Sequence, residues 1–370
     1  MLVLICTDDA SIGSFYSFIL QRCDRVRLTV VARSNYEAVK QDVCLRLQLK
    51  YQSANTSAGH LHRQRQPRPA SLSTSRRYGS THDVKYTVAN LSVIQSLSEV
   101  THPFDYIVFA HKAIDQDAVA SQLQSAVDVD TTLVIIQNGV GNEEPFRRLY
   151  PGISIISGVV CMSLYTHHCE HDNSRTQTWV GATQIQPGTV KHTQSEDLQI
   201  GLYANTSQDR GDEETNLSTF ASLLETGKTR FQVLSQTDIQ RQRWEKVVWN
   251  AAWNSLTTLT MVDTQTWLHS SPSAMAATRR LMREVIDVGR ACGVPLQYEL
   301  IDKLVDKILA MPGIGSSMQT DYRHGRPLEV DVILGVPVQK ATELNVDTPV
   351  LEMVYALIRA VDSRLRASLL

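Results

Sequence analysis

Short apolar runs alternate with amphipathic stretches over the first half of the chain. The clearest apolar runs are 1–5, 26–32, 106–110 and 132–137, and residues 12–20 have the length and apolar spacing of a helix. Strands that alternate with crossover helices are typical of βαβ units and a mostly parallel sheet. We expect the later runs 153–162, 178–181, 188–192 and 198–203 to extend that sheet, some of them antiparallel.

The pattern changes to long helices after residue 237. Helical spacing is found at 238–259, 271–293, 299–311 and 349–367. The second of these has an apolar stripe at steps of three and four, which must pack on a core; its members are Ala274, Ala277, Leu281, Val285, Val288 and Cys292. The fold class predicted is therefore α/β, with a Rossmann-type domain over 1–236 and an all-α domain over 237–370. A cleft between two domains is the expected ligand site.

Residues 51–80 interrupt the α/β pattern. They are rich in Ser, Gly, Gln and Pro and contain five arginines. This composition predicts an inserted, mobile surface segment. A basic nuclear or RNA-binding signal is the alternative, and it is the less common meaning of such a stretch.

Composition narrows the class of protein and partner. The 370 residues are 42% hydrophobic and 20% charged, which is typical of a globular protein. A net charge of −2 gives no positive field, so neither nucleic acid nor an anionic membrane is the expected partner. No apolar run approaches the ~18 residues of a membrane span. The six cysteines form no CxxC pair, so we expect no zinc site or disulfide framework and a reducing, intracellular compartment.

The turn after the first predicted strand has part of a dinucleotide-binding pattern. The GxGxxG fingerprint would place glycines at 8, 10 and 13, but only Gly13 is present, with Asp8 and Ala10 at the other positions. A carboxylate here opposes a phosphate, which a helix N-terminus otherwise attracts. The alternative is an ordinary turn in which Asp8 or Asp9 caps the helix, and this turn alone leaves the two interpretations equal.

The end of the second predicted strand favours a nucleotide. Arg33 lies 33 − 13 = 20 residues after Gly13, where an NAD-binding fold has an acid for the ribose hydroxyls. An arginine with a neighbouring hydroxyl, here Ser34, can instead bind a 2′-phosphate. NADP is therefore favoured over NAD, with a surface arginine at a strand end as the alternative.

Two further strand ends point to the same edge of the sheet. Lys112 follows the run 106–110 and Asn138 follows 132–137. Ligands of open α/β sheets bind outside the carboxyl ends of the strands, where both side chains should lie. Asn138 also fits a common Asn-Gly turn, so its signal is weak when taken alone.

The predicted helix at 238–259 has a polar face. Lys246, Asn250 and Asn254 stand at i, i+4 and i+8, so they share one side of the helix. Each asparagine costs about 0.5 kcal/mol relative to alanine inside a helix, which suggests that it serves a ligand. The alternative is a ladder of buried side chains that satisfy one another's hydrogen bonds.

Two segments near the end of the chain add candidate residues. Ser316 and Ser317 follow a glycine-containing loop and suit a carboxylate ligand, and Glu329 stands beside apolar residues. Helix capping by either serine is the plain alternative.

Taken together, these segments resemble the ketopantoate reductase (2-dehydropantoate 2-reductase) family, particularly its fungal members. The likeness rests on residues 32–38, 136–146, 156–160, 244–254, 316–318 and 329–331, and it covers nearly the whole chain except the insertion. It implies a Rossmann-type domain followed by a helical domain, and NADPH-dependent reduction of ketopantoate, a small 2-oxo acid, to pantoate on the route to pantothenate and coenzyme A. It also implies a cytoplasmic location, with mitochondria as the alternative, and leaves a homodimer open.

The resemblance also assigns roles to the candidate residues. It implies Lys246 as the general acid, Glu329 as the acid at the reacting group, Asn250, Asn254 and Ser317 as substrate-binding residues, Lys112 and Asn138 as residues near the nicotinamide and substrate, and Arg33 as the 2′-phosphate ligand. The chain departs from the family at Asp8 and Ala10, which should weaken cofactor binding by about one to a few kcal/mol. Two alternatives therefore stay open: a relative that acts on another 2-oxo acid or a specialised metabolite, and a nucleotide-poor pseudoenzyme that serves as a binding module.

Overall fold

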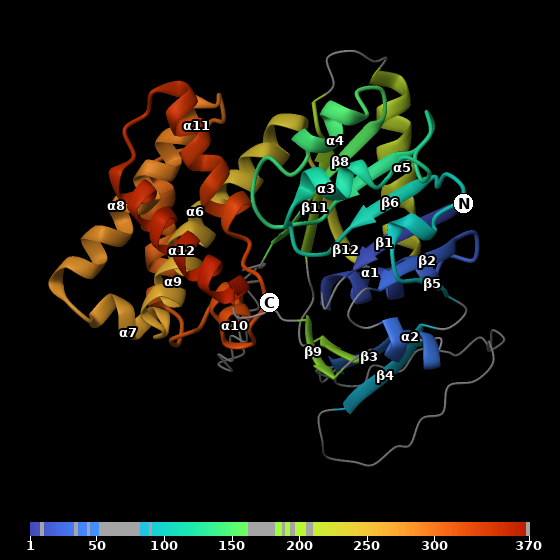
Figure 1. The fold of residues 1–370 in the computed structure, drawn as a ribbon, viewed down its shortest axis with the longest axis horizontal. Helices are drawn as coiled ribbons and strands as arrows, with labels where there is room; N and C mark the ends of the chain where they lie inside the picture. Colours follow the sequence, from blue (N-terminus) through green and yellow to red (C-terminus); the bar gives the residue numbers. More distant parts are fainter. Residues whose placement is uncertain are drawn as a thin grey trace, which may run out of the picture.

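The computed structural model has an α/β part and a helical part that lie side by side (Figure 1). The structure describes residues 1–7, 11–32, 36–42, 45–51, 82–88, 91–161, 182–186, 189–192, 197–204 and 210–367. The predicted insertion at 51–80 lies outside the described residues except for Tyr51.

An eight-stranded sheet forms the centre of the α/β part, in the order β12-β11-β8-β7-β6-β1-β2-β5. Its strands are β1 (Leu2–Thr7), β2 (Arg27–Ala32), β5 (Ser92–Ile94), β6 (Tyr106–Phe109), β7 (Thr132–Ile135), β8 (Ser154–Cys161), β11 (Asp197–Leu202) and β12 (Arg230–Val233). All neighbours are parallel except the pair β8 and β11. The chain builds outward from β1 first to β2 and later to β6, which is the switch point of a Rossmann-type sheet. This confirms the predicted fold class.

Both faces of the sheet are covered, which explains the continuous apolar runs in the sequence. Val3 and Ile5 of β1 pack in a cluster with residues of α1 (Ser11–Gln21) and α5 (Arg210–Thr226). Leu4 and Cys6 pack in a second cluster on the opposite face, with residues of α3 (Gln116–Ser121) and α4 (Glu144–Leu149). The alternation of side chains along one strand thus supplies two cores.

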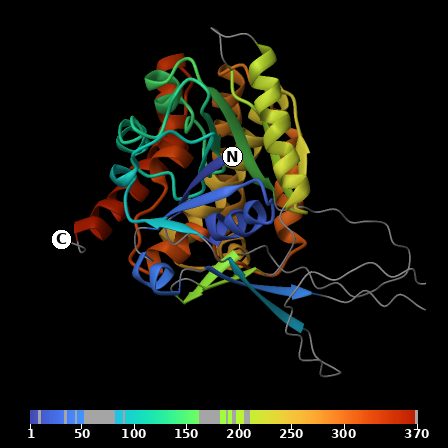
Figure 2. The same cartoon turned by 90° about the vertical axis from the view of Figure 1, so that its right-hand side faces the viewer.

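A second, four-stranded sheet has the order β4-β3-β10-β9. Its strands are β3 (Leu45–Tyr51), β4 (His82–Val88), β9 (Ala182–Gln186) and β10 (Thr189–His192), and a short helix α2 (Tyr36–Asp42) precedes it. The prediction that 188–192 extends the main sheet is therefore wrong, whereas 178–181 lies outside the described residues. Helix α1 lies between this sheet and the strands β1 and β2 (Figures 1 and 2), and residues 13–20 are all buried.

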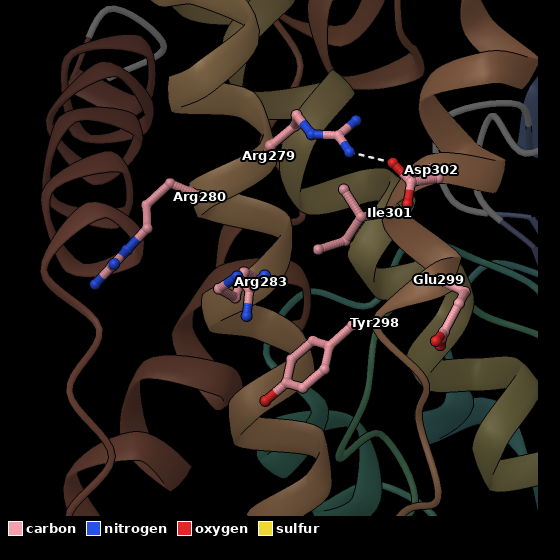
Figure 3. A pocket seen from close by; sticks show the side chains of 7 residues that line it. All are labelled: Arg279, Arg280, Arg283, Tyr298, Glu299, Ile301 and Asp302. Carbon is pink, nitrogen blue, oxygen red and sulfur yellow. Dashed lines mark hydrogen bonds and ion pairs between the residues drawn. The ribbon is translucent and has the colours of Figure 1, made fainter.

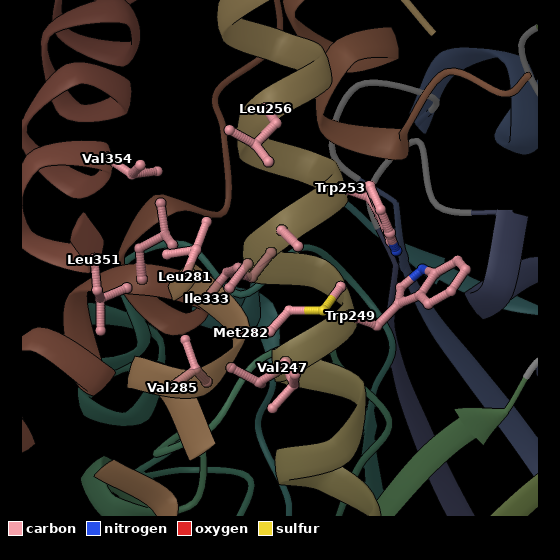
Figure 4. Packing of buried hydrophobic residues seen from close by; sticks show 14 of the residues in the cluster. Val247, Trp249, Trp253, Leu256, Leu281, Met282, Val285, Ile333, Leu351 and Val354 are labelled. Atoms are coloured by element: carbon pink, nitrogen blue, oxygen red, sulfur yellow. The ribbon is translucent and has the colours of Figure 1, made fainter. Parts of the chain in front are cut away.

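The helical part is built around α6 and α8. Its elements are α6 (Gln236–Thr260), α7 (Thr264–His269), α8 (Pro272–Ala291), α9 (Glu299–Leu309), α10 (Ser317–Arg323), a π-helical turn η2 (Asp331–Gly335), α11 (Val336–Leu344) and α12 (Pro349–Ala367). Figure 4 shows the core, where Leu281 and Val285 of α8 lie between Val247 of α6 and Leu351 of α12. The division predicted at residue 236 coincides with the start of α6 and stays a prediction. No helix in the described part of the chain is long and apolar enough to span a membrane.

The apolar stripe predicted on α8 is partly wrong. Ala277 and Cys292 are exposed, whereas Met282 and Ile286 are buried in the core beside Leu281 and Val285. The face that packs is rotated toward the larger side chains, because these bury more apolar area than alanine does.

Candidate active site

Gly13 lets α1 approach the end of β1 closely. A Cβ atom at this position would lie 2.3 Å from Thr7 Oγ1 and 2.4 Å from Thr7 Cβ, so only glycine fits. Close packing of helix on strand is the role of the third glycine in a dinucleotide turn. This cradle, at the switch point of the sheet, fits a dinucleotide. The other predicted cofactor positions Asp8, Ala10, Arg33 and Ser34 lie outside the described residues.

Lys112 stands at the carboxyl end of β6, as predicted, and contacts the helical part. Its Nζ lies 2.5 Å from Oδ1 of Asp321 on α10. Arg326 shares that carboxylate oxygen, with Nη2 at 3.0 Å. Sequence reasoning missed Asp321 as a site residue, although it stands four positions after Ser317 and so on the same face of α10.

Asn138 and Glu329 join the two parts of the molecule. The Asn138 side-chain amide donates to Glu329 Oε2 at 3.0 Å, and the Ala113 N–H donates to Oε1 at 3.1 Å. Glu329 is only 8% exposed, and both of its oxygens accept a hydrogen bond, as an ionised carboxylate can. The loop after Asn138 is docked on η2, because the Val140 N–H donates to the Val332 carbonyl at 2.9 Å.

Gly139 permits this docking. Its φ is +91°, in the left-handed region, and a Cβ atom there would lie 2.5 Å from the Val332 carbonyl oxygen. The Asn-Gly pair that is typical of a simple turn therefore serves here to bring Asn138 to the other domain.

The polar face of α6 is directed at the same edge of the sheet. Lys246 is half-buried, and its Nζ donates to the Val160 carbonyl of β8 at 2.8 Å. Asn250 and Asn254 are 7% and 4% exposed, yet neither side-chain amide is hydrogen-bonded to any described residue. Within the described part of the chain the mutually satisfied ladder is therefore not formed. Two nearly buried amides with unused donors and acceptors favour a ligand.

The two serines of the last motif have different surroundings. Ser316 is the N-cap of α10, accepting from the Gln319 N–H at 3.0 Å and from the Thr257 hydroxyl at 2.7 Å. Helix capping is thus confirmed for Ser316. Ser317 begins the helix and is exposed, so its hydroxyl is accessible to a ligand.

A pocket of ≈ 360 Å³ between α8 and α9 contains none of the predicted site residues (Figure 3). Its arginines already have partners: Arg279 pairs with Asp302, Arg280 with Glu284 at 2.7 Å, and Arg283 stacks on the Tyr298 ring at 4.7 Å. The candidate active site is instead the junction where the strand ends meet α6, α10 and η2.

Known proteins are similar to this chain in sequence and in fold. The chain matches the family model of ketopantoate reductase PanE/ApbA over residues 10–205 and that of its C-terminal domain over 238–362. A 2-dehydropantoate 2-reductase from Nostoc sp. is 26% identical over 262 residues, which are 71% of this chain and 75% of the relative.

Two solved structures extend the comparison. The 2-dehydropantoate 2-reductase from Methylococcus capsulatus is 26% identical, with a TM-score of 0.70 and coverage of 99% of this chain and 98% of the other. A ternary structure of D-mandelate dehydrogenase with NADH and anilino(oxo)acetate has a TM-score of 0.72 and covers 99% of each chain, but at 19% identity it shows the fold alone. Since the family model matches more than half of the sequence, the chain belongs to the ketopantoate reductase family.

Proposed function

We propose that the protein reduces the ketone of 2-dehydropantoate to the alcohol of pantoate, with NADPH as the reductant. The observation that carries the proposal is the hydrogen bond between Asn138 and Glu329, which joins residues 191 positions apart that the sequence had marked independently. It closes the two domains around the strand ends that bind ligands in this fold.

NADPH, when bound, supplies a hydride to the ketone carbon. The Lys246 ammonium stabilises the negative charge that develops on the ketone oxygen and then donates a proton to it. The Val160 carbonyl, which accepts from Lys246 Nζ at 2.8 Å, fixes the direction of this side chain. Asn250 and Asn254 orient the substrate with their unused amide groups, and Ser317 offers a hydroxyl to its carboxylate.

The same residues give a direct test of the mechanism. Lys246→Ala should lower kcat by about 10²–10⁴-fold, as expected for loss of a general acid, while leaving the NADPH dissociation constant near its natural value. Asn250→Ala and Asn254→Ala should raise KM for 2-dehydropantoate at least as much as they lower kcat. The control is Lys303→Ala, an exposed lysine of α9. Lysine is not the proton donor if Lys246→Ala turns over normally and only melts earlier.

The choice of NADP rests on the sequence position of Arg33, which lies outside the described residues. Arg33→Asp should weaken NADPH far more than NADH, and Arg27→Asp at the opposite, exposed end of β2 serves as the control. Equal losses for both cofactors would show that Arg33 does not recognise the 2′-phosphate.

One set of assays distinguishes the proposed function from its two alternatives. A reductase for another 2-oxo acid would reduce that acid, for example phenylglyoxylate, faster than 2-dehydropantoate in initial-rate measurements. A pseudoenzyme would neither oxidise NADPH with any 2-oxo acid nor change its fluorescence on titration, because Asp8 and Ala10 replace two glycines. A homodimer and a cytoplasmic location stay predictions, which sedimentation velocity and microscopy of the tagged chain would test.

A further inference from the structure

A buried arginine lies one turn before Lys246 on α6. Arg243 is 2% exposed and is among the largest fully buried side chains of the described chain. It comes from the helical domain, yet the groups that surround its guanidinium belong to the α/β domain. Nothing in the mechanism proposed above uses it.

The guanidinium is hydrogen-bonded through all three nitrogens to β8 and to the end of β7 with the loop that follows it. Nη1 donates to the carbonyls of Gln137 at 3.0 Å and Gly139 at 3.1 Å. Nη2 donates to the carbonyls of Ile135 at 3.2 Å and Gly158 at 3.1 Å. The Ser157 hydroxyl accepts from Nε at 2.9 Å and from Nη2 at 2.8 Å. Arg243 therefore links the carboxyl end of β7 to the middle of β8.

Glu143 balances the charge. Its Oε1 lies 3.0 Å from Arg243 Nε and accepts from the Ser157 hydroxyl at 2.6 Å. The Glu143 side chain is 1% exposed, so the ion pair is shielded from solvent. A buried ion pair is a weak source of net stability, since desolvation offsets its attraction. What distinguishes the ion pair from an apolar contact of the same size is that its hydrogen bonds require one defined placement of the bonded groups.

The acceptors of Arg243 stand next to the proposed site residues. The Gln137 carbonyl belongs to the peptide group before Asn138, and the Gly139 carbonyl belongs to the second peptide group after it, so the backbone is held on both sides of Asn138. The Gly158 carbonyl lies two residues before that of Val160, which holds Lys246. One side chain thus fixes the backbone that aims Asn138 at Glu329 and the strand that aims Lys246.

We propose that Arg243, paired with Glu143, is a positioning residue for the reaction: it sets the placement of Lys246 relative to Asn138 and Glu329 without touching substrate. This inference rests on the proposed function for its kinetic consequences and on the contacts above for its structural ones. A lysine cannot replace it, because one ammonium has three donors and no fork to span the four carbonyls.

The test compares Arg243→Lys and Ser157→Ala with Glu284→Gln. Ser157→Ala removes one acceptor and keeps the buried ion pair, so it remains informative if Arg243→Lys does not fold. Glu284→Gln is the matched control, since Glu284 is another carboxylate with 1% exposure, paired with Arg280 and accepting from the N–H groups of Val350 and Leu351. For each variant we would measure Tm, the NADPH dissociation constant, kcat and KM at a temperature where circular dichroism shows a folded protein.

Arg243→Lys should lower kcat by about 10–100-fold, the size expected when reacting groups are displaced by about 1 Å, with NADPH affinity within about threefold of the natural value. Ser157→Ala should show a smaller loss in the same direction. Glu284→Gln should lower Tm at least as much as Ser157→Ala, with kcat unchanged. A folded Arg243→Lys protein with natural kcat, or an equal loss of kcat in the control, overturns the proposal.

Hydrogen exchange provides a measurement that needs no turnover. In Arg243→Lys and Ser157→Ala, amides of 137–141 and 156–160 should exchange faster, while Glu284→Gln should leave them unchanged. If the natural protein does not reduce 2-dehydropantoate, the proposed function is wrong. The hydrogen-exchange measurement then tests by itself whether Arg243 fixes these backbone segments. Unchanged exchange in both the Arg243 and the Ser157 variant overturns that role whatever the activity.

Discussion

Replacing Asn138 by aspartate would set two carboxylates against each other at the domain junction. The substitution is nearly isosteric, but the amide that donates to Glu329 at 3.0 Å becomes a second acceptor. With both groups ionised at that distance, Coulomb repulsion amounts to about 5 kcal/mol at an effective dielectric constant of about 20. Asn138 is only partly buried, so solvent should reduce this to about 1–3 kcal/mol.

The repulsion makes stability depend on pH. One carboxyl of the introduced pair would hold its proton to a higher pH in the folded state than in the unfolded state, where the two are far apart. A folded pKa above the unfolded value means that stability falls as pH rises through that window. A folded pKa that lies about one pH unit above the unfolded pKa removes about 1.4 kcal/mol of stability at neutral pH.

The assay is urea unfolding at 25 °C from pH 4 to pH 8, with Asn138→Ala as the control. The alanine variant loses the same hydrogen bond and adds no charge. The aspartate variant should approach it near pH 4, the unfolded pKa of a carboxyl, and be about 1–3 kcal/mol less stable at pH 8. If the two variants give parallel curves over this range, Asn138 and Glu329 do not contact each other in solution and the two domains meet in a different way.

Two other predictions concern packing and burial. Gly13→Ala should lower Tm and also weaken NADPH binding, because a Cβ atom 2.3 Å from Thr7 Oγ1 forces α1 away from β1. Overpacking of this kind costs about 1–3 kcal/mol of stability. If fluorescence titration shows unchanged NADPH affinity in a variant with a lower Tm, the start of α1 does not contribute to the cofactor site. Burial raises the pKa of Glu245, so its ionisation opposes folding above its unfolded pKa. Glu245→Gln should therefore raise Tm at pH 7 and leave it unchanged at pH 4, and equal shifts of Tm at both pH values would contradict this effect of burial.

The main sheet could be predicted from the sequence because its strands are buried on both faces. Such strands are continuous apolar runs, and their order in a βαβ chain fixes which strand ends lie together. That logic identified Lys112 and Asn138 correctly at the ends of β6 and β7. The second sheet was missed, although Leu45, Leu47 and Leu49 alternate with polar residues in β3, because the segment borders the insertion and pairs with strands far away in the sequence.

Two residues of the junction could not be found from sequence patterns. Asp321 has the appearance of an ordinary helix-surface acid, and its importance comes from Lys112 in the other domain. Arg243 is bound mostly by main-chain carbonyls, and every residue has one, so no side-chain pattern marks these acceptors. Both residues gain their roles only when the two domains meet.

Because helix α1 is enclosed between two sheets, it limits which amino-acid substitutions this protein can accept. A helix that covers one face of a sheet ordinarily has a polar, solvent-exposed face, as amphipathic helices do, and such a face accepts substitutions freely. Here residues 13–20 have no such face, so a deep mutational scan should find no tolerant positions among them. Adaptation of cofactor binding is then confined to the turn before the helix and to the residues beyond β2. Asp8 and Ala10, which stand where the fingerprint has glycines, come directly before α1 in the sequence and outside its buried stretch.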